Sequence, residues 1–436
     1  DETHETRKEK EVDVKVDDMI ILSIDDHSVE PPNLFEHHVP AAYKDRAPRL
    51  VRNADGKEHW EFEGREFGIF GLNATVSWPK EEWGMNPSAL AEMRPATYLV
   101  DERVRDMDRN GVLASMCFPS LPGFSGRRFQ EADDKDLALV MLQAYNDWHI
   151  DEWCASHPGR FMPISIGPAW DMDAMVAEIK RVSAKGCRAI SMPELPHVQG
   201  LASYQSDYWD PFFTAICDEG MVMCLHIGMG LDAIDMGPDL SMDNYMVLST
   251  QVTVLAVQDL LWGPAFRKYA DLKVAFSEGG IGWIPFLMDR VDRHYVNQRW
   301  TGQDFGDKMP SEVLREHSLA CFISDPTSLK LHDDIGIDII AFETDYPHSD
   351  SLWPDAPEVL LAQCNGAGLT DEEIDKISWE NVARFCDYDP FAVIPREQAT
   401  VGALRARSTD VDTSTVSRSE WRRRYEAHPT YHLATA

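Results

Sequence analysis

The stretch MIILSIDDHSVEPP, residues 19–32, runs an apolar segment directly into two aspartates and a histidine. A continuous apolar run is typical of a strand that is buried on both faces of a parallel sheet. Side chains alternate along a strand, so we expect Asp25 and His27 to point to one face and Asp26 to the other. Because acidic side chains are rarely buried unless they are paired or bind a metal, the segment predicts a buried strand that ends in a metal site or in an ordinary polar turn.

Six further segments are continuously apolar and predict buried strands in the same way. Amphipathic helical patterns, with apolar residues at three- and four-residue spacing, lie between most of them. The strand segments are 112–118, 161–166, 187–192, 221–227, 273–278 and 337–345, and the clearest helical segments are 136–157, 172–186 and 209–220. Repeated strand-helix units without a G-x-G-x-x-G motif predict an α/β fold of the TIM type, a (β/α)8 barrel. With the segment at 19–24, only seven strands are found.

Two regions interrupt this alternation. Residues 33–100 form a long Trp- and Pro-rich insertion after the first strand, where barrel enzymes commonly build a lid. From about residue 393 the chain is polar and locally Arg-rich, so we expect residues 393–436 to form an extension that wraps a neighbour or stays mobile. The expected organisation is an N-terminal segment (1–18), a barrel with its lid (19–392) and this extension.

The composition narrows the class of partner. The chain of 436 residues carries a formal net charge of -33, which disfavours nucleic acid and anionic membranes because both would be repelled over most of the surface. It shows no apolar run long enough to cross a bilayer and no signal-peptide pattern at its start. The eight cysteines include no C-x-x-C pair. We expect a cytoplasmic protein with reduced thiols that assembles as a homo-oligomer, a dimer.

Polar side chains follow the predicted strands at their carboxyl ends, where barrel enzymes carry their chemistry. They are Asp25, His27, His226, Glu278, Glu343, Asp345 and His348. Carboxylates and imidazoles are the ligands that Zn(II), Fe(II) and Mn(II) accept, and ligands from separate strands leave a position open for water or substrate. The set indicates a catalytic metal site.

These residues also have simpler structural interpretations. His226 is also explained as a hydrogen-bonded core histidine, Glu278 as the cap of the helix that follows it, and Asp345 as a turn residue. The GMG turn after His226 and the difficulty of leaving Asp345 unpaired favour ligands at these two positions. His348 lies in a loop, where it either donates to a ligand or acts beside it.

Taken together, several motifs resemble the amidohydrolase superfamily, specifically its amidohydrolase-related branch, which includes metal-dependent nonoxidative decarboxylases. The resemblance covers about residues 19–390. It rests on IDDHSVEPP, HPGRFMPISIGPAWDMDAMVAEIKR followed by GCRAISMPE, LHIGMG, FSEGGIGWIPFLMDRVDRHY, FETDYPHSDSLWP and ENVARFC.

The resemblance implies a divalent metal held by an H-x-H or E-x-H pair at the first strand, a histidine at the fifth and an aspartate at the eighth. By position these become Asp25, His27, His226 and Asp345. This chain has a D-x-H pair, Asp25 and His27, in place of the usual H-x-H or E-x-H. The pair gives a harder set of ligands, so iron or manganese becomes plausible beside zinc. A second departure is Glu278, which stands where the family usually has a histidine at the sixth strand. With Glu194 and His348 as further donors, Glu278 permits one or two ions.

Three functions follow from this resemblance. The first is a hydrolase that acts on a small carboxylic acid derivative, an ester, an amide or a thioester such as an acyl-CoA, with Asp345 accepting a proton from water and Glu278 and His348 assisting. The alternative is a nonoxidative decarboxylase of an aromatic or unsaturated acid. The third is a binding protein that has lost catalysis. The motifs leave open whether Asp25 or Asp26 supplies the first-strand carboxylate.

Overall fold

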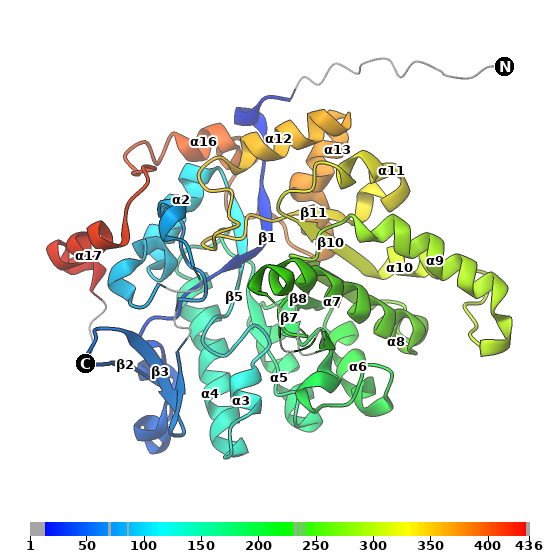
Figure 1. The fold of residues 1–436 in the computed structure, drawn as a ribbon, viewed down its shortest axis with the longest axis horizontal. Helices are drawn as coiled ribbons and strands as arrows, with labels where there is room; N and C mark the ends of the chain where they lie inside the picture. Colours follow the sequence, from blue (N-terminus) through cyan, green and yellow to red (C-terminus); the bar gives the residue numbers. More distant parts are fainter. Residues whose placement is uncertain are drawn as a thin grey trace.

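Eight parallel strands form a closed barrel at the centre of the molecule (Figure 1). The computed structural model describes residues 14–68, 71–84, 87–230, 233–234, 237, 239 and 241–432. The barrel strands are β1 (Leu22–His27), β5 (Ala114–Phe118), β6 (Ile164–Ile166), β7 (Ala189–Met192), β8 (Val222–His226), β9 (Lys273–Ser277), β10 (Ser318–Phe322) and β11 (Ile340–Phe342).

The barrel consists of two sheets that meet at two places, with few backbone contacts at each. Strands β1 and β5 pair with each other and β6 to β11 form a six-stranded sheet. A single bridge from Ser115 to Phe161 joins β5 to β6. On the other side, the Asp345 N–H donates to the Asp25 carbonyl at 3.0 Å, which joins β11 to β1. The prediction of a (β/α)8 barrel is confirmed.

Strand β10 is the one that the sequence patterns miss. Its residues, SLACF, are small and polar at the start and directly follow helix α10 (Pro310–His317) without a loop. The segment therefore lacks both the β-branched composition and the turn residues that mark the other strands. All seven predicted strands are present.

Helices surround the strands, as the amphipathic patterns predict (Figure 1). Asp134 and Asp171 cap two of them by accepting from the backbone N–H groups of Leu137 and Ala174. The longer helices are α2 (Val100–Asn110), α4 (Lys135–Asp147), α5 (Met172–Ser183), α6 (Asp210–Asp218), α7 (Met242–Trp262), α9 (Trp283–Asn297), α10 and α12 (Ala356–Ala367). The shorter ones are α1 (Leu34–His38), α3 (Arg127–Gln130), α8 (Ala265–Lys268), α11 (His332–Ile335), α13 (Asp371–Asp375) and α14 (Asn381–Phe385).

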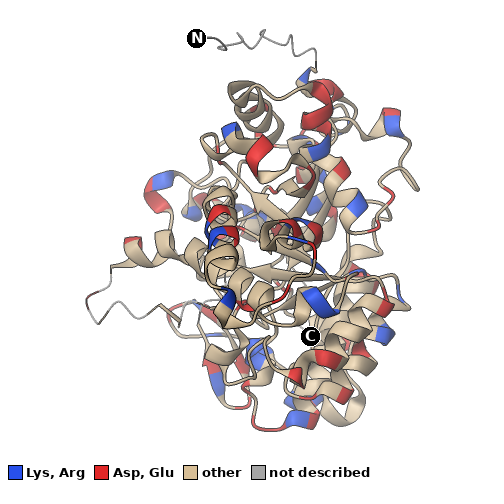
Figure 2. Ribbon diagram, turned by 90° about the vertical axis from the view of Figure 1, so that its right-hand side faces the viewer, with Lys and Arg blue, Asp and Glu red and all other residues tan. Residues whose placement is uncertain are grey.

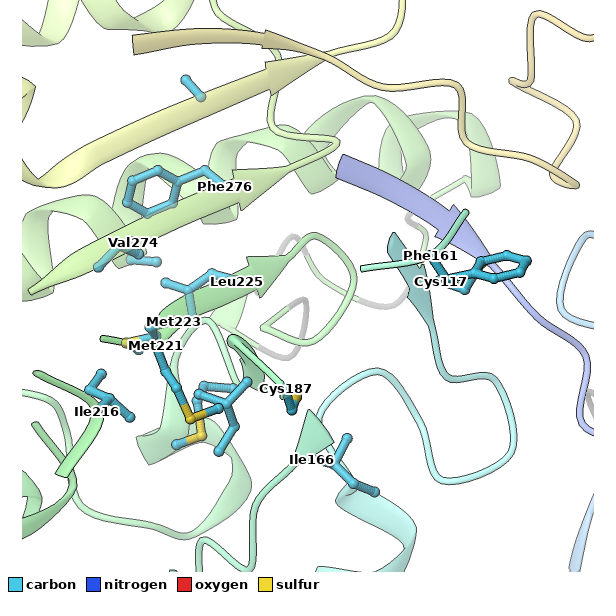
Figure 3. Close-up of a cluster of buried hydrophobic side chains, with 14 of the residues drawn as sticks. Cys117, Phe161, Ile166, Cys187, Ile216, Met221, Met223, Leu225, Val274 and Phe276 are labelled. Carbon is cyan, nitrogen blue, oxygen red and sulfur yellow. The ribbon is translucent and has the colours of Figure 1, made fainter. Parts of the chain in front are cut away.

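The alternation of side chains along the strands separates two apolar layers. Val222 and Cys224 belong to the cluster that fills the barrel interior. Met223 and Leu225, on the same strand, belong to the layer between strands and helices, where Figure 3 shows them near Phe276. His226 continues the series of Val222 and Cys224, so the period of two directs its side chain to the inside of the barrel.

The insertion and the extension pack on each other. Within residues 33–100, strands β2 (Arg49–Arg52), β3 (Glu58–Phe62) and β4 (Arg65–Phe67) form a small antiparallel sheet. The extension contains α15 (Arg396–Ala399), α16 (Val401–Arg405) and α17 (Arg418–Ala427). Figure 1 shows α17 and this sheet on the same side of the molecule.

A small apolar cluster fixes the extension to the insertion. The indole of Trp421 is buried with Trp78 and Val416, and the Val416 N–H donates to the Ser77 carbonyl at 2.7 Å. The extension, described up to residue 432, therefore packs on the insertion of its own chain. Whether it also wraps a neighbouring chain stays a prediction. Ala399, Val401 and Leu404 of the extension are also buried in the main apolar core.

Charged side chains of both signs are interleaved over the helices and loops (Figure 2). None of the helices that the structure describes is both long and apolar enough to span a membrane.

Candidate metal centre

The end of strand β1 is irregular, and the irregularity decides which acidic side chain enters the barrel. Ile24 belongs to the interior cluster, so strict alternation would turn Asp26 inward next. Just before Asp26, however, β1 has two residues where β5 has one, which is a β-bulge. The bulge reverses the alternation, and Asp25 and His27 instead lie together at the barrel mouth.

Two other acidic residues reach the mouth through unusual backbone conformations. Glu278, just after β9, has φ of 54°, and Asp345, after β11, has φ of 50°. The left-handed region is sterically unfavourable for side chains other than glycine and is concentrated at functional sites. The Glu278 N–H donates to Glu343 Oε1 at 3.0 Å, which holds this conformation.

These elements bring together the side chains that the sequence singles out. The cluster consists of Asp25, His27, His226, Glu278, Asp345 and His348. His27 Nε2 lies 3.5 Å from Asp25 Oδ1, 3.4 Å from Asp345 Oδ1 and 3.1 Å from His226 Nε2. One imidazole nitrogen therefore lies close to a ligand atom from its own strand and to ligand atoms from β8 and from the end of β11.

His226 and His348 complete the cluster. His226 Nε2 lies 3.3 Å from Asp25 Oδ2 and 3.8 Å from Glu278 Oε2. The Nδ1–H of His226 is placed to donate to the Ile227 carbonyl at 2.7 Å, so its Nε2 carries the lone pair. His348 Nδ1 lies 2.8 Å from Asp345 Oδ1 and 3.7 Å from Glu278 Oε1.

The donor set fits a divalent ion. Within the described part of the chain, neither side-chain oxygen of Asp25 has a hydrogen-bond partner, although the residue is fully buried. Such a carboxylate is costly unless a cation compensates it. Its neighbours are imidazole nitrogens and further carboxylates, the ligand mixture of catalytic zinc, iron and manganese sites. Two groups within the cluster have ligand atoms close enough together to hold an ion. One is Asp25, His27 and His226, and the other is His27, Glu278, Asp345 and His348.

The electrostatics of the cluster also favour a cation. Burial raises the pKa of the Asp25 carboxyl, and Glu343, Glu278 and Asp345 raise it further by repulsion. Burial would also raise the pKa of Glu278, but His226 and His348 outweigh it and lower that pKa to about 2. Burial disfavours a charged His348, yet Asp345 and Glu278 outweigh it and raise its pKa to about 10. The excess of negative charge is concentrated around Asp25.

Other acidic residues near the mouth have protein partners. Glu194, considered above as a donor for a second ion, accepts from the Gly230 N–H at 3.2 Å and from the Thr253 hydroxyl at 3.3 Å. Burial raises its pKa to about 8. Asp26 points away from the cluster and accepts from the Thr344 hydroxyl at 2.5 Å and the Tyr346 N–H at 2.9 Å. Asp25 is therefore the first-strand carboxylate that faces the cluster.

A cavity of about 800 Å³ opens above the cluster. Glu278, Asp345 and His348 line one end of it, and Phe67 and Leu72 of the insertion line another part of the wall. Other lining residues, which no sequence motif indicates, include Phe124, Arg127, Arg128 and the first part of α7.

Phe124 lies against two imidazole rings of the cluster. Its ring centroid lies 4.0 Å from that of His226 and 5.1 Å from that of His27. The glycines of LPGFSG, residues 121–126 after β5, are the signal that would have pointed to this loop.

Comparison with known proteins places this geometry in a family. A family model described as amidohydrolase matches residues 36–386, which begins after the β1 motif. Similar solved structures include an amidohydrolase from Mycobacterium avium subsp. paratuberculosis K-10, with 19% identity, a TM-score of 0.66 and coverage of 84% of this chain and 98% of that chain. Another is 5-carboxyvanillate decarboxylase LigW from Sphingomonas paucimobilis, with 17% identity, a TM-score of 0.59 and coverage of 85% and 100%.

A third similar structure is a dihydroxybenzoic acid decarboxylase from Polaromonas sp. JS666 that was solved with bound manganese and the inhibitor 2-nitroresorcinol. It has 16% identity, a TM-score of 0.57 and coverage of 85% of this chain and 97% of that chain. These identities establish the shared fold, and the family match spans most of the barrel. The chain belongs to the amidohydrolase family of enzymes.

Proposed function

We propose that this enzyme is a metal-dependent nonoxidative decarboxylase of an aromatic or unsaturated carboxylic acid. The observation that carries the proposal is that the Phe124 ring lies against His226 and His27 of the donor cluster and also lines the cavity that Glu278, Asp345 and His348 line. Two of the similar structures are decarboxylases of aromatic acids by name. Hydrolysis is the first expectation from the sequence motifs, and these observations favour the alternative, decarboxylation.

Asp25, His27, His226 and Asp345 would hold the divalent ion, for which zinc, iron and manganese are the candidates. When bound, the ion would fix the substrate carboxylate and stabilise negative charge in the transition state. Phe124 supplies a flat apolar surface on which an unsaturated group can lie. The chain thus binds the acid group at the cluster and orients the unsaturated carbon above it.

Asp345 and His348 are the groups that would handle the proton. Their side chains are 2.8 Å apart and both line the cavity, and Asp345 and Glu278 outweigh burial and raise the pKa of His348 to about 10, so the imidazole is protonated near neutral pH. In the reaction, the bond between the unsaturated carbon and the carboxyl group breaks and its electron pair stays on carbon. The Asp345–His348 pair donates a proton to this carbon, which forms the new C–H bond as CO2 leaves. Water then returns a proton to the two side chains.

Hydrolysis is the second candidate, and Glu278 is the observation that favours it. A carboxylate in place of the sixth-strand histidine adds an oxygen donor beside His226 and His348, which suits a centre with two ions. In that reaction Asp345 accepts a proton from the attacking water, and an ester, an amide or a thioester is cleaved.

Product analysis separates the candidates. Protein loaded separately with manganese, zinc or iron is incubated with hydroxybenzoates, unsaturated acids, esters, amides and acyl-CoA thioesters, and CO2 and cleavage products are measured. Release of CO2 from an acid is expected, whereas cleavage of esters or thioesters without CO2 would replace the proposal by hydrolysis. A chain that takes up none of the three metals would indicate the binding protein.

Two variants assign the reaction to this centre. His226→Ala is expected to lower metal content and abolish turnover. Asp345→Asn is expected to retain part of the metal and to lose about 10²- to 10⁴-fold in kcat, the range for a lost acid or base. Near-native turnover in Asp345→Asn with full metal content in His226→Ala would place the site elsewhere.

A further inference from the structure

One stripe of helix α7 lines the cavity. The lining residues on this helix include Met242, Tyr245, Met246, Ser249 and Thr250, which follow the spacing of one helix face. Along this stripe the exposed fraction falls from 57% at Met242 and 52% at Met246 to 7% at Ser249. The helix therefore descends from the surface toward the barrel mouth.

Just below the stripe, the helix reaches the strand ends. Thr253 is 2% exposed, and its hydroxyl lies 3.3 Å from Glu194 at the end of β7. The same cavity is lined by Glu278, Asp345 and His348. The stripe of α7 at the surface and the donor cluster at the barrel mouth therefore line different parts of the same cavity.

The upper part of the stripe is apolar in a way that needs an explanation. Met242, Tyr245 and Met246 are large side chains with 40% or more of their surface exposed. Contiguous exposed apolar residues mark binding sites, and methionine side chains adapt to flexible ligands. Phe67 and Leu72 of the insertion add apolar surface to the lining of the same cavity. Both groups of side chains suit a hydrocarbon.

We propose that the part of the cavity along α7 is a subsite for a long, flexible apolar chain carried by the substrate at the end remote from its carboxyl group. This inference rests on the proposed function only for the position of the carboxyl group at the cluster. A cavity of about 800 Å³ falls in the range that drug-sized ligands occupy, which exceeds the need of one aromatic ring. The substrate is accordingly an amphipathic acid.

Binding of unreactive acids tests the subsite separately from the reaction. The probes are straight-chain saturated carboxylates from butanoate to dodecanoate, titrated calorimetrically into metal-loaded protein. These acids have neither an unsaturated carbon to protonate nor an acyl bond to hydrolyse. The Kd is expected to fall up to about fourfold for each added methylene, the value for complete burial of a methylene, until the chain fills the cavity.

A matched pair of variants locates the effect. Met246→Glu places a charge on the stripe and is expected to flatten the dependence of Kd on chain length. Leu255→Glu is the control, because Leu255 is on the same helix, is 42% exposed and does not line the cavity. It is expected to keep the wild-type dependence. The molar mass of all three proteins is measured by sedimentation.

Three results would overturn the inference. They are a Kd that does not depend on chain length in the wild type, equal flattening in both variants, and a lower molar mass of Met246→Glu with unchanged chain-length dependence. The last would make the stripe an interface between copies of the chain. A steep chain-length dependence in a protein that never releases CO2 would support the subsite while refuting decarboxylation.

Discussion

The two faces of the end of strand β1 carry neighbouring aspartates in opposite environments. Both side chains are buried, with 0% of Asp25 and 1% of Asp26 exposed. Asp26 accepts from the hydroxyls of Ser23, Ser115 and Thr344 and lies 3.9 Å from Arg103. Within the described ranges, the Asp25 side chain has no hydrogen-bond donor. One carboxylate is compensated by the protein, and the other is compensated only if a cation binds.

The electrostatics express the same difference. Burial raises the pKa of both carboxyls. At Asp26 the guanidinium of Arg103 and the hydroxyl donors oppose this effect, whereas at Asp25 the neighbouring carboxylates add to it. Removal of the charge should therefore have opposite consequences at the two positions.

Asp25→Asn is expected to have the largest effect, and it acts on function. Metal content should fall, and kcat/KM should fall by more than about 100-fold, the upper range for residues that only support a ligand. The free energy of unfolding of the metal-free protein should stay the same or rise, because an uncompensated buried charge is removed. Metal analysis, kinetics and urea unfolding in a chelator check this. Full metal occupancy in the variant would contradict the role of Asp25.

Asp26→Asn is expected to act on stability instead. The amide group would face hydroxyl and N–H donors and leave Arg103 without its buried partner, a change that costs about 3 kcal/mol or more in the free energy of unfolding. The folded fraction should bind metal with near-native stoichiometry. If this variant unfolded like the wild type but lost its metal, the roles of the two aspartates would be exchanged.

The sequence predicted the relative faces of these residues but not their absolute direction. Alternation correctly separates Asp25 and His27 from Asp26. The choice of face depends on the bulge opposite β5, which depends on a partner strand about 90 residues away and leaves no local pattern. The position of Glu278 likewise depends on a left-handed residue that is not a glycine, a conformation that composition does not indicate.

Elsewhere in the chain, sequence patterns predict some elements and miss others, and each outcome has a physical reason. Strongly apolar strands and amphipathic helices reveal themselves through burial, so the barrel was predictable from the chain alone. Strand β10 was missed because it lacks β-branched residues and follows α10 without a loop. Phe124 and the stripe of α7 were missed because tertiary folding, rather than strand periodicity, brings them over the cluster. Sequence motifs alone therefore did not predict the apolar wall of the cavity.

Glu30, three residues beyond His27, has an environment intermediate between those of the two aspartates. Its carboxyl accepts from the Ser120 and Leu121 N–H groups at 2.8 and 2.7 Å, yet burial raises its pKa from 4.5 to about 7. The folded state therefore favours the protonated form. Protonated Glu30 therefore contributes to the free energy of unfolding, and this contribution is fully present below pH 4.5 and is lost as the pH rises through 7. The free energy of unfolding falls by no more than about 1.4 kcal/mol per pH unit in this range.

Glu30→Gln removes this titration. Urea unfolding of the wild type and the variant at pH 5, 6, 7 and 8 should show that the wild type loses stability relative to the variant as the pH rises. A difference that stays constant with pH, or that moves in the opposite sense, would mean that Glu30 is ionised throughout and compensated like Asp26.

Thr344→Val is expected to have the smallest effect and tests the contribution of one donor to Asp26. The substitution keeps the shape of the side chain and removes the hydroxyl that lies 2.5 Å from Asp26 Oδ1. A hydrogen bond to a charged group contributes about 1.5–3 kcal/mol, so a loss toward the lower end is expected because other donors remain. Thr253→Val is the control, since its acceptor Glu194 has a pKa of about 8 and is largely neutral at pH 7. Thr253→Val should lower the free energy of unfolding by only about 1 kcal/mol.

The loss in Thr344→Val should largely disappear in the background of Asp26→Asn, because the charge that strengthens the bond is then absent. Equal losses for both threonines in the wild-type background would show that the charge of Asp26 does not distinguish its side of β1.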